Sequence, residues 1–443
     1  MEFTEHRLTS YSGLELLIRY FRNTGLNRLI RKHLADVVPG KDFGVVAFCR
    51  VILGLLIVGG RRLRHIEFLK GDPMFERFCG LCQLPTDRTV SRWLKDFRAR
   101  TVTVLKSLNA EVVAQVVKSY LPARTLTIDV DGTVISTGLK VGWAFRGYNP
   151  HHRKVPSYFP ISALLAESGH ILRLHNRPGN VNDGSSSLTF LRELFQQIKE
   201  TLGRAYKLRF RMDGDFFKIK VLKLLESHNA GYAIKVPFWQ CLDLQRLILT
   251  CSQWERVEDG IDGFFSHVSI KKWRRRVPVA IFRKRVHHKT KKNYQIDLFD
   301  PSNGTWEYSA VTTNLGLDIR HLWRFMCGRG MHEKAIGELK TGFALDCVPT
   351  NQYAANSAWQ QLVVLAHNLL ANFQIETGTP AKPRTQKRTT MWILEQAQTL
   401  RFELFNRAGL LLQPKGRTIL RLADNPRVRK RFSRTVDALE NAA

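Results

Sequence analysis

The order of strand and helix patterns between residues 124 and 236 constrains the fold of this chain most strongly. Three β-branched or apolar runs come first, and two more follow, separated by segments of helical periodicity. The predicted strands are 125–130, 158–165, 170–174, 207–212 and 232–236, and the predicted helices are 188–202 and 217–228. A three-strand meander followed by β-α-β units implies a mixed sheet with helices on its faces. The sequence therefore predicts an α/β domain.

The segments around this domain have different patterns. Before residue 120, apolar residues recur at helical spacing, which predicts an all-α N-terminal domain. Strand patterns return between 240 and 315 and indicate an inserted β subdomain with a small sheet of its own. We expect a helical DNA-binding domain at 1–120, the α/β core at 121–239 and 316–375, the inserted basic β subdomain at 240–315, and a basic helical C-terminal region at 376–443.

The charge of the chain indicates its partner. Lys and Arg number 69 against 38 Asp and Glu, a formal net charge of +31, and 44% of residues are hydrophobic, enough to build folded cores. A basic surface attracts polyanions because neutralised phosphates release their counterions, so nucleic acid is the expected partner, with an acidic membrane as the second choice. The most apolar run, 45–58, contains Arg50 and is shorter than the roughly 20 residues of a membrane span, so it predicts a buried helix.

Two basic segments are candidate DNA contacts. A short helix after Thr86 or Asp87 carries Arg88 and Arg92, which favours the recognition helix of a helix-turn-helix motif, with a solvated face of a bundle helix as the alternative. The second segment, 271–292, contains no acidic residue and has Trp273 and Tyr294 within or beside it. Its central residues are Arg274, Arg275 and Arg276. We expect this segment to contact DNA, although charge runs are often only solvated faces.

The cysteines indicate the compartment. Their number is seven and they are scattered, which suits a reducing cytosol. Cys79 and Cys82 have the spacing of a zinc knuckle, but no second pair lies near them in the sequence, so we expect ordinary thiols.

Three carboxylates are candidate metal ligands. Asp131 and Asp213 each end a predicted strand, and Glu333 lies in a predicted helix around 330–341. Sites in open α/β sheets form at the carboxyl ends of strands, so the two aspartates are expected to meet. Such a cluster needs divalent cations, and two Mg²⁺ or Mn²⁺ ions suit phosphodiester chemistry. Each residue has the alternative of an ordinary strand-end or turn position. Asp129 and Asp215, two residues away from the chosen aspartates, also remain open as ligands.

Arg329, Glu333 and Lys340 share one stripe of the predicted helix, because their spacings of four and seven residues are close to whole turns. A carboxylate flanked by two cations suits the phosphates around a scissile bond. The alternative is an intrahelical ladder of salt bridges.

The same three residues match the R-x3-E-x6-K part of the Y-x2-R-x3-E-x6-K signature of insertion-sequence DDE transposases. The chain resembles the IS-four-like superfamily of these enzymes over roughly residues 120–375. Further matching segments are Ile128–Thr133, 147–150, Arg177–Asn180, Arg211–Phe216 and Ala366–Leu370. One departure is Met326, which stands where the signature has tyrosine, with Trp323 as a nearby aromatic residue.

The resemblance implies an RNase H-like catalytic domain with a β insertion, and cut-and-paste transposition with two Mg²⁺ ions. It implies Asp131, Asp213 and Glu333 as the catalytic triad, and Arg329 and Lys340 as phosphate contacts. The implied partners are double-stranded transposon ends and target DNA, held by a homodimer in a synaptic complex in the cytoplasm near the nucleoid. The competing functions are a non-catalytic DNA-binding protein on the same scaffold and a stand-alone RNase H-like nuclease.

Overall fold

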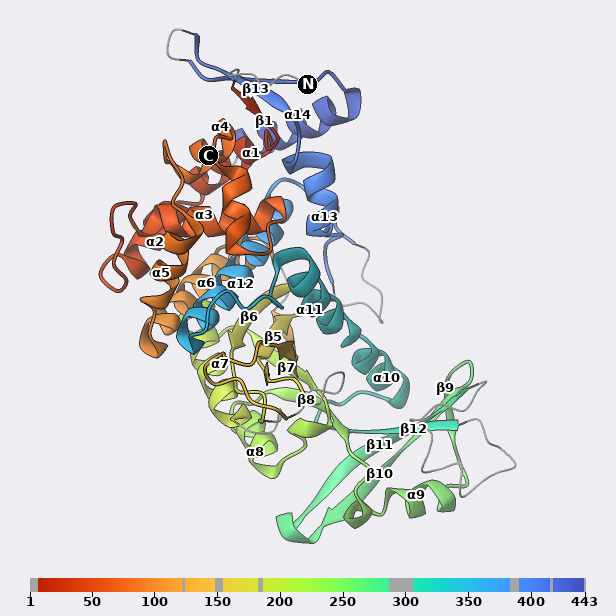
Figure 1. Ribbon diagram of the computed structural model, residues 1–443. Coiled ribbons are helices and arrows are strands. Elements are labelled where there is room, and N and C mark those ends of the chain that lie inside the picture. Colours follow the sequence, from red (N-terminus) through yellow and green to blue (C-terminus); the bar gives the residue numbers. More distant parts are fainter. Residues whose placement is uncertain are drawn as a thin grey trace.

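The computed structural model describes residues 7–121, 124–147, 154–181, 186–286, 306–382, 390–414 and 417–441. Within these residues, the largest sheet has nine strands in the order β6-β5-β2-β7-β8-β12-β11-β10-β9. A helical body covers one part of this sheet, and the strands added after β8 extend to the opposite end of the molecule (Figure 1).

The first five strands of the sheet form its core. They are β2 (Thr125–Gly132), β5 (Ile161–Leu165), β6 (His170–His175), β7 (Lys207–Met212) and β8 (Gly231–Val236). β5 is antiparallel to β2 and to β6, whereas β7 is parallel to β2 and β8 is parallel to β7. The helices α7 (Ser187–Thr201) and α8 (Ile219–Ser227) precede the two parallel strands. This order and these directions are those of an RNase H-like sheet, so the predicted mixed α/β fold is confirmed.

Both faces of the core sheet are covered, which explains why β5 is buried at every position along its length. On one face, Ile128 and Val130 of β2 pack in one cluster with Leu191 of α7. On the other face, Leu164 and Leu174 belong to the cluster of α12 (Tyr353–Glu376). α12 is buried along most of its length, and its buried polar residues find partners, since Asn368 and Asn372 donate hydrogen bonds to the carbonyl oxygens of Ile171 and Val112.

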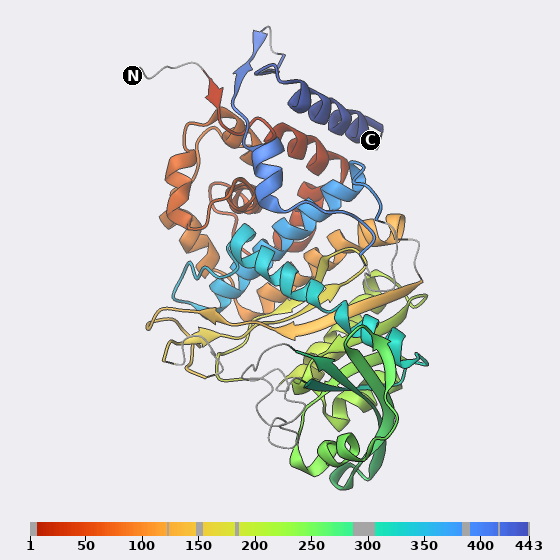
Figure 2. The same ribbon diagram turned by 90° about the vertical axis from the view of Figure 1, so that its right-hand side faces the viewer.

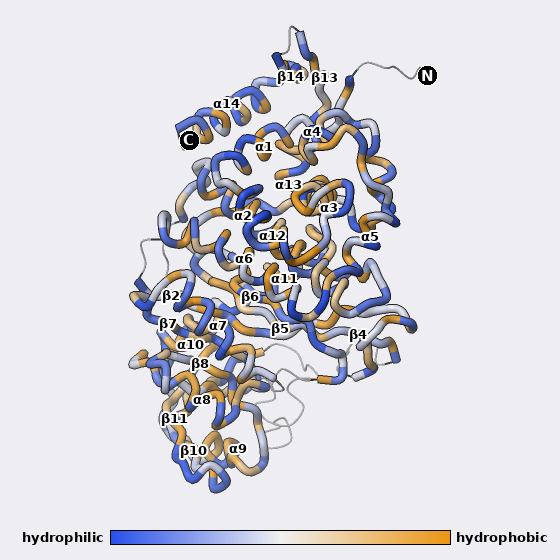
Figure 3. Tube along the Cα trace, turned by 90° about the vertical axis from the view of Figure 1, so that its left-hand side faces the viewer, coloured by the Kyte–Doolittle hydropathy of each residue, from blue (hydrophilic) through white to orange (hydrophobic). Residues whose placement is uncertain are grey.

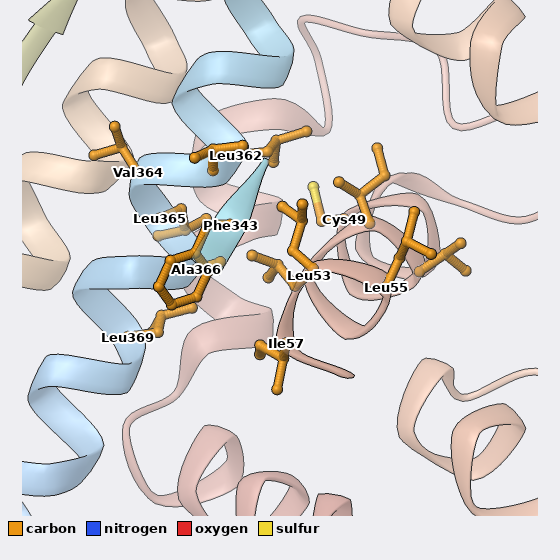
Figure 4. Packing of buried hydrophobic residues seen from close by; sticks show 14 of the residues in the cluster. Cys49, Leu53, Leu55, Ile57, Phe343, Leu362, Val364, Leu365, Ala366 and Leu369 are labelled. Atoms are coloured by element: carbon orange, nitrogen blue, oxygen red, sulfur yellow. The ribbon is translucent and has the colours of Figure 1, made fainter. Parts of the chain in front are cut away.

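The N-terminal body is helical, as predicted. It contains α1 (Leu14–Asn23), α2 (Leu26–Leu34), α3 (Val45–Val58), η1 (Leu63–Leu69), α4 (Pro73–Cys79), α5 (Asp87–Lys95) and α6 (Ala99–Tyr120). Hydrophobic residues gather where α3 and α12 meet (Figure 3). There Leu53 and Ile57 face Leu365 and Leu369, beside Phe343 (Figure 4).

The predicted buried helix at 45–58 is confirmed as α3. Its one charged residue, Arg50, is 8% exposed, and its guanidinium lies over the rings of Phe21 and Phe78 at 5.8 and 5.1 Å. Over the described ranges, no helix combines the length and the apolar character needed to cross a bilayer.

The insertion contains η3 (Gln240–Leu242), α9 (Leu244–Thr250), β9 (Glu255–Glu258), β10 (Ile261–Ile270), β11 (Arg275–Arg285) and β12 (Trp306–Thr313). The prediction of a separate small sheet is wrong, because β12 pairs with β8 and makes the insertion a continuation of the core sheet. An unpaired edge of β8 would leave backbone donors and acceptors without partners, and β12 satisfies them. The strand predicted at 294–299 lies outside the described residues.

The C-terminal region returns to the N-terminal helices. It contains α13 (Ala397–Leu400), the short helix η5 (Arg401–Phe405), β13 (Gly409–Leu412), β14 (Ile419–Leu422) and α14 (Pro426–Asn441). β13 pairs with β1 (Leu8–Thr9), and α14 lies along α1 (Figure 2). The sequence predicted a helical C-terminal region, and the structure differs from this prediction by the β13–β14 hairpin. The predicted domain boundaries stay predictions.

Candidate active site

Asp131 and Asp213 come together at one edge of the sheet. β2 and β7 are parallel neighbours in which Val130 pairs with Met212, so the next residue on each strand is an aspartate at the carboxyl end. Their side chains are 17% and 31% exposed. Nη2 of Arg329 lies 2.6 Å from Oδ2 of Asp131 and 3.9 Å from Oδ2 of Asp213. Both carboxylates therefore face one cation.

Arg329 reaches this position from the junction of two helices. α10 (Ile319–Cys327) ends just before it, and α11 (Gly330–Phe343) begins just after it. Gly328 permits the close approach of this junction to the sheet, because a Cβ atom there would lie 2.0 Å from Nη1 of Arg211. The same Nη1 donates a hydrogen bond of 2.8 Å to the carbonyl oxygen of Phe325, which attaches the end of α10 to β7.

Asp129 has a different environment from Asp131. Its side chain is fully buried, and its two carboxylate oxygens accept hydrogen bonds from Nε and Nη2 of Arg211 at 2.5 and 2.8 Å. Arg211 is 1% exposed. Asp129 and Arg211 thus form a buried bidentate pair inside the sheet.

Asp215 also differs from its neighbour. It is exposed, and its backbone N–H donates a 3.1 Å hydrogen bond to Oδ1 of Asp213, which begins the short turn η2 (Gly214–Phe216). Burial raises the pKa of Asp213, the positive charge of Arg329 lowers it, and Asp215 raises it again. The pKa of Asp213 is therefore raised overall, because burial outweighs the nearby cation.

Glu333 does not complete a cluster with the two aspartates. It is exposed in the first turn of α11, and the described residues contain no group of three His, Cys, Asp or Glu side chains that could hold a metal ion. The helix prediction itself is confirmed, so Glu333 lies one turn after Arg329 on the same face. The structure thus brings two of the three predicted carboxylates together.

Lys340 contacts the segment that follows Asp131. Its Nζ donates a 3.0 Å hydrogen bond to the carbonyl oxygen of Val134. Burial lowers the pKa of Lys340, and Asp346 opposes this shift. Across the described part of the chain, no ion pair joins Glu333 to Arg329 or Lys340. The alternative of an intrahelical salt-bridge ladder is therefore wrong, because both cations are directed to the sheet.

His332 is a site residue that the sequence prediction missed. It is 1% exposed, with Nε2 at 3.0 Å from Oγ of Ser162 and Nδ1 at 3.9 Å from Oδ2 of Asp131. Burial lowers its pKa to about 3, so the ring is neutral near pH 7. The sequence contains a signal for its burial. His332 begins a stripe at helical spacing that continues with Ile336, Leu339 and Phe343, and this stripe is the buried face of α11.

Met326 and Trp323 belong to the packing of α10. Met326 is partly buried in a cluster that includes Phe282 of β11, and the rings of Trp323 and Phe282 lie 5.1 Å apart. Both residues therefore help to hold α10 against the insertion.

The structure does not bring Arg274, Arg275 and Arg276 to the carboxylates. They lie at the turn between β10 and β11, level with the amino end of β8, whereas Asp131 and Asp213 follow the carboxyl ends of their strands. Arg275 is bound to Glu226 by hydrogen bonds of 2.9 and 2.7 Å. Arg274 and Arg276 are exposed, and the predicted basic residues 289, 291 and 292 lie outside the described residues.

The predicted basic helix is confirmed as α5. The side chain of Thr86 accepts a hydrogen bond from the backbone N–H of Thr89, and Trp93 is buried. Arg88 and Arg92 are exposed on the other side of the helix, which packs against η1 and α12. Nearby, Cys79 is buried and Cys82 is exposed, and both are free thiols.

Comparisons with known proteins point to one family. The family profile described as "Transposase DDE domain group 1" matches residues 1–443. Among solved structures, the piggyBac transposase synaptic complex with hairpin DNA aligns with a TM-score of 0.40 and 11% identity, over 90% of this chain and 75% of that chain. The Mos1 transposase paired-end complex with left transposon end aligns with a TM-score of 0.19 and 10% identity, over 36% and 52%. No curated protein sequence matches the chain.

Proposed function

We infer that this chain, which belongs to the DDE transposase family of domain group 1, catalyses cleavage at terminal inverted repeats and strand transfer in cut-and-paste transposition. The observation that carries the proposal is the position of Asp131 and Asp213, which end adjacent parallel strands and face the same cation. The spacing of Arg329, Glu333 and Lys340 supports membership of the IS-four-like superfamily, which we also propose.

The donor set of the site suits divalent cations. Carboxylate oxygens are the ligands that Mg²⁺ and Mn²⁺ prefer. Asp131 and Asp213 share the single guanidinium of Arg329, so one negative charge remains in excess at the place where an ion would be held. We propose that Asp131, Asp213 and Glu333 hold two Mg²⁺ or Mn²⁺ ions. When bound, the ions activate a water or 3′-hydroxyl and stabilise the leaving oxygen.

The other residues of the site orient the carboxylates and the DNA. Nε of Arg329 is buried and has no hydrogen-bond partner among the described residues, so the site leaves one donor of this guanidinium unsatisfied. The hydrogen bond between Ser162 and Nε2 of His332 holds this ring with its Nδ1 at 3.9 Å from Oδ2 of Asp131. Both carboxylate oxygens of Asp129 are bound to Arg211, which favours Asp131 as the metal ligand on β2. The side chain of Asp215 is exposed, which favours Asp213 as the ligand at the end of β7.

The proposed substrate is double-stranded DNA, at the transposon ends and at the target. The net charge of +31 supports a polyanionic partner. Because one transposition event joins two ends to one target, we propose that a homodimer holds both ends in a synaptic complex.

Cleavage of a duplex that contains the terminal inverted repeat is expected in Mg²⁺ and not in EDTA. The reason is that the carboxylates need the ions to stabilise charge at the scissile phosphate. The measurement is strand cleavage of an end-labelled duplex beside a scrambled duplex of equal length. Binding without cleavage in Mg²⁺ or Mn²⁺ would support the non-catalytic DNA-binding protein, and equal cleavage of both duplexes would support a stand-alone nuclease.

Lys340→Gln is expected to leave the fold intact and to lower end cleavage at least tenfold. The substitution removes a charge and loosens the segment held through Val134, and a misplaced scissile phosphate reacts slowly. Single-turnover cleavage and thermal denaturation measure the two effects. Lys334→Gln, at an exposed position of the same helix, is the matched control. Normal cleavage by Lys340→Gln would leave Lys340 with a structural role only.

A further inference from the structure

A basic cleft lies between the N-terminal helical body and the segment that follows α11. Its volume is about 1010 Å³, and it is bounded by η1, α5 and residues 346–349. Its cations are Arg61, Arg62, Arg64, Arg88, Arg92 and Lys95, and its acidic residues are Asp87 and Asp346. We call it the Arg61–Lys95 cleft. The cations exceed the acids in a concave surface, which concentrates positive potential there.

Most of these cations are available to a ligand. Arg62, Arg64, Arg88 and Arg92 are exposed, and none of them forms an ion pair within the described ranges. Both acids are already engaged, since Asp87 accepts from the backbone N–H at the start of α5 and Asp346 pairs with Arg61. The repulsion among the remaining cations would be relieved by a polyanion.

Arg61 connects the cleft to the helix that carries Glu333. Its Nη1 donates hydrogen bonds of 3.0 and 2.9 Å to the carbonyl oxygens of Lys340 and Thr341, near the end of α11. Its Nη2 contacts both carboxylate oxygens of Asp346 at 2.7 Å. α11 has 14 residues, so its ends are about 21 Å apart, which is roughly six base pairs along a B-form duplex.

We propose that the Arg61–Lys95 cleft binds the phosphate backbone of the transposon end, roughly six base pairs from the scissile bond. In this proposal Arg61 is a positioning residue that sets the distance between the cleft and the carboxylates. The cations project from two walls of a cleft, not from one protruding helix, which favours backbone contacts over base reading in a groove. The inference rests on the proposed transposase function.

The first test compares two double variants that remove the same charge. Arg62→Gln with Arg64→Gln removes two positive charges from one wall of the cleft. Arg28→Gln with Arg31→Gln removes two positive charges from exposed positions on α2. Fluorescence anisotropy with an end-containing duplex in EDTA, between 50 and 200 mM salt, gives the slope of log K against log[salt]. The cleft variant is expected to flatten this slope by about 0.9 for each phosphate that it no longer neutralises, and the α2 variant to leave it unchanged.

The second test concerns distance. Uncharged methylphosphonate linkages placed roughly six base pairs from the cleavage position are expected to weaken binding by the wild type and not by the cleft variant. Arg61→Gln is expected to bind with an unchanged slope, to cleave at scattered positions and to be partly rescued by Arg61→Lys. Product lengths on an end-labelled duplex measure this, and thermal denaturation verifies the fold.

Three results would overturn the proposal. They are an unchanged slope in the cleft variant, equal flattening by the α2 variant, and binding of single strands as tight as binding of the duplex. If the wild type and the cleft variant both bind and cleave the duplex normally, only the proposal about the cleft is rejected. A wild-type protein that binds no duplex rejects the proposed function itself.

Discussion

Asp131→Ala, Asp213→Ala and Glu333→Ala are each expected to abolish strand cleavage and joining, while binding to the terminal-repeat duplex in EDTA survives. Each change removes a proposed metal ligand, and loss of several kcal/mol of transition-state stabilisation lowers the rate roughly a thousandfold or more. Binding survives because it comes from phosphate contacts elsewhere on the basic surface. Single-turnover cleavage, joining and anisotropy on the same samples measure the three properties.

The three variants are expected to differ in stability. Asp131→Ala leaves Arg329, which is 8% exposed, without its partner at 2.6 Å, and this should cost about 1–3 kcal/mol. Glu333→Ala changes an exposed side chain and should cost less than about 0.5 kcal/mol. Asp215→Ala, beside Asp213 in the sequence, is the control that should keep its activity. Near-wild-type strand transfer by any of the three variants would remove that residue from the proposed triad.

Asp129→Asn is expected to destabilise the protein by about 3–5 kcal/mol, because it leaves the charge of Arg211 buried and uncompensated. Arg211→Met should lower the free energy of unfolding by a similar amount, since it leaves the charge of Asp129 buried without a partner. It also removes the hydrogen bond to the carbonyl oxygen of Phe325 that holds α10. The double variant should cost less than the sum, because both single changes break one interaction. Urea denaturation in EDTA measures all three.

An exposed ion pair gives the control for this experiment. Asp243 and Arg246 are 57% and 72% exposed, so Asp243→Asn should cost less than about 1 kcal/mol. Under conditions where Asp129→Asn is folded, it should keep metal-dependent cleavage. A stable but inactive Asp129→Asn protein would instead make Asp129 the metal ligand and Asp131 the ordinary strand-end residue.

The core strands and the two aspartates at their ends were predictable from short stretches of sequence. β7 was predicted with the bounds that the structure has, Lys207–Met212, because alternating apolar residues and the following Asp-Gly pair are local signals. The convergence of Asp131 and Asp213 followed from a general property of parallel strands, whose carboxyl ends share an edge. The catalytic roles of these residues, which were carried over from the family resemblance, stay predictions.

The sequence by itself therefore determined the α/β class, the helical N-terminal body and the strand ends at which Asp131 and Asp213 meet. Only the tertiary structure decided that β12 joins β8, that Arg211 pairs with Asp129, and that Arg61 holds the end of α11. The physical reason is sequence separation. Periodicity and turn signals act between neighbours in the sequence, whereas Arg61 and Lys340 are 279 residues apart. A strand edge or a guanidinium can form hydrogen bonds with any suitable group that the packing of the whole chain brings next to it.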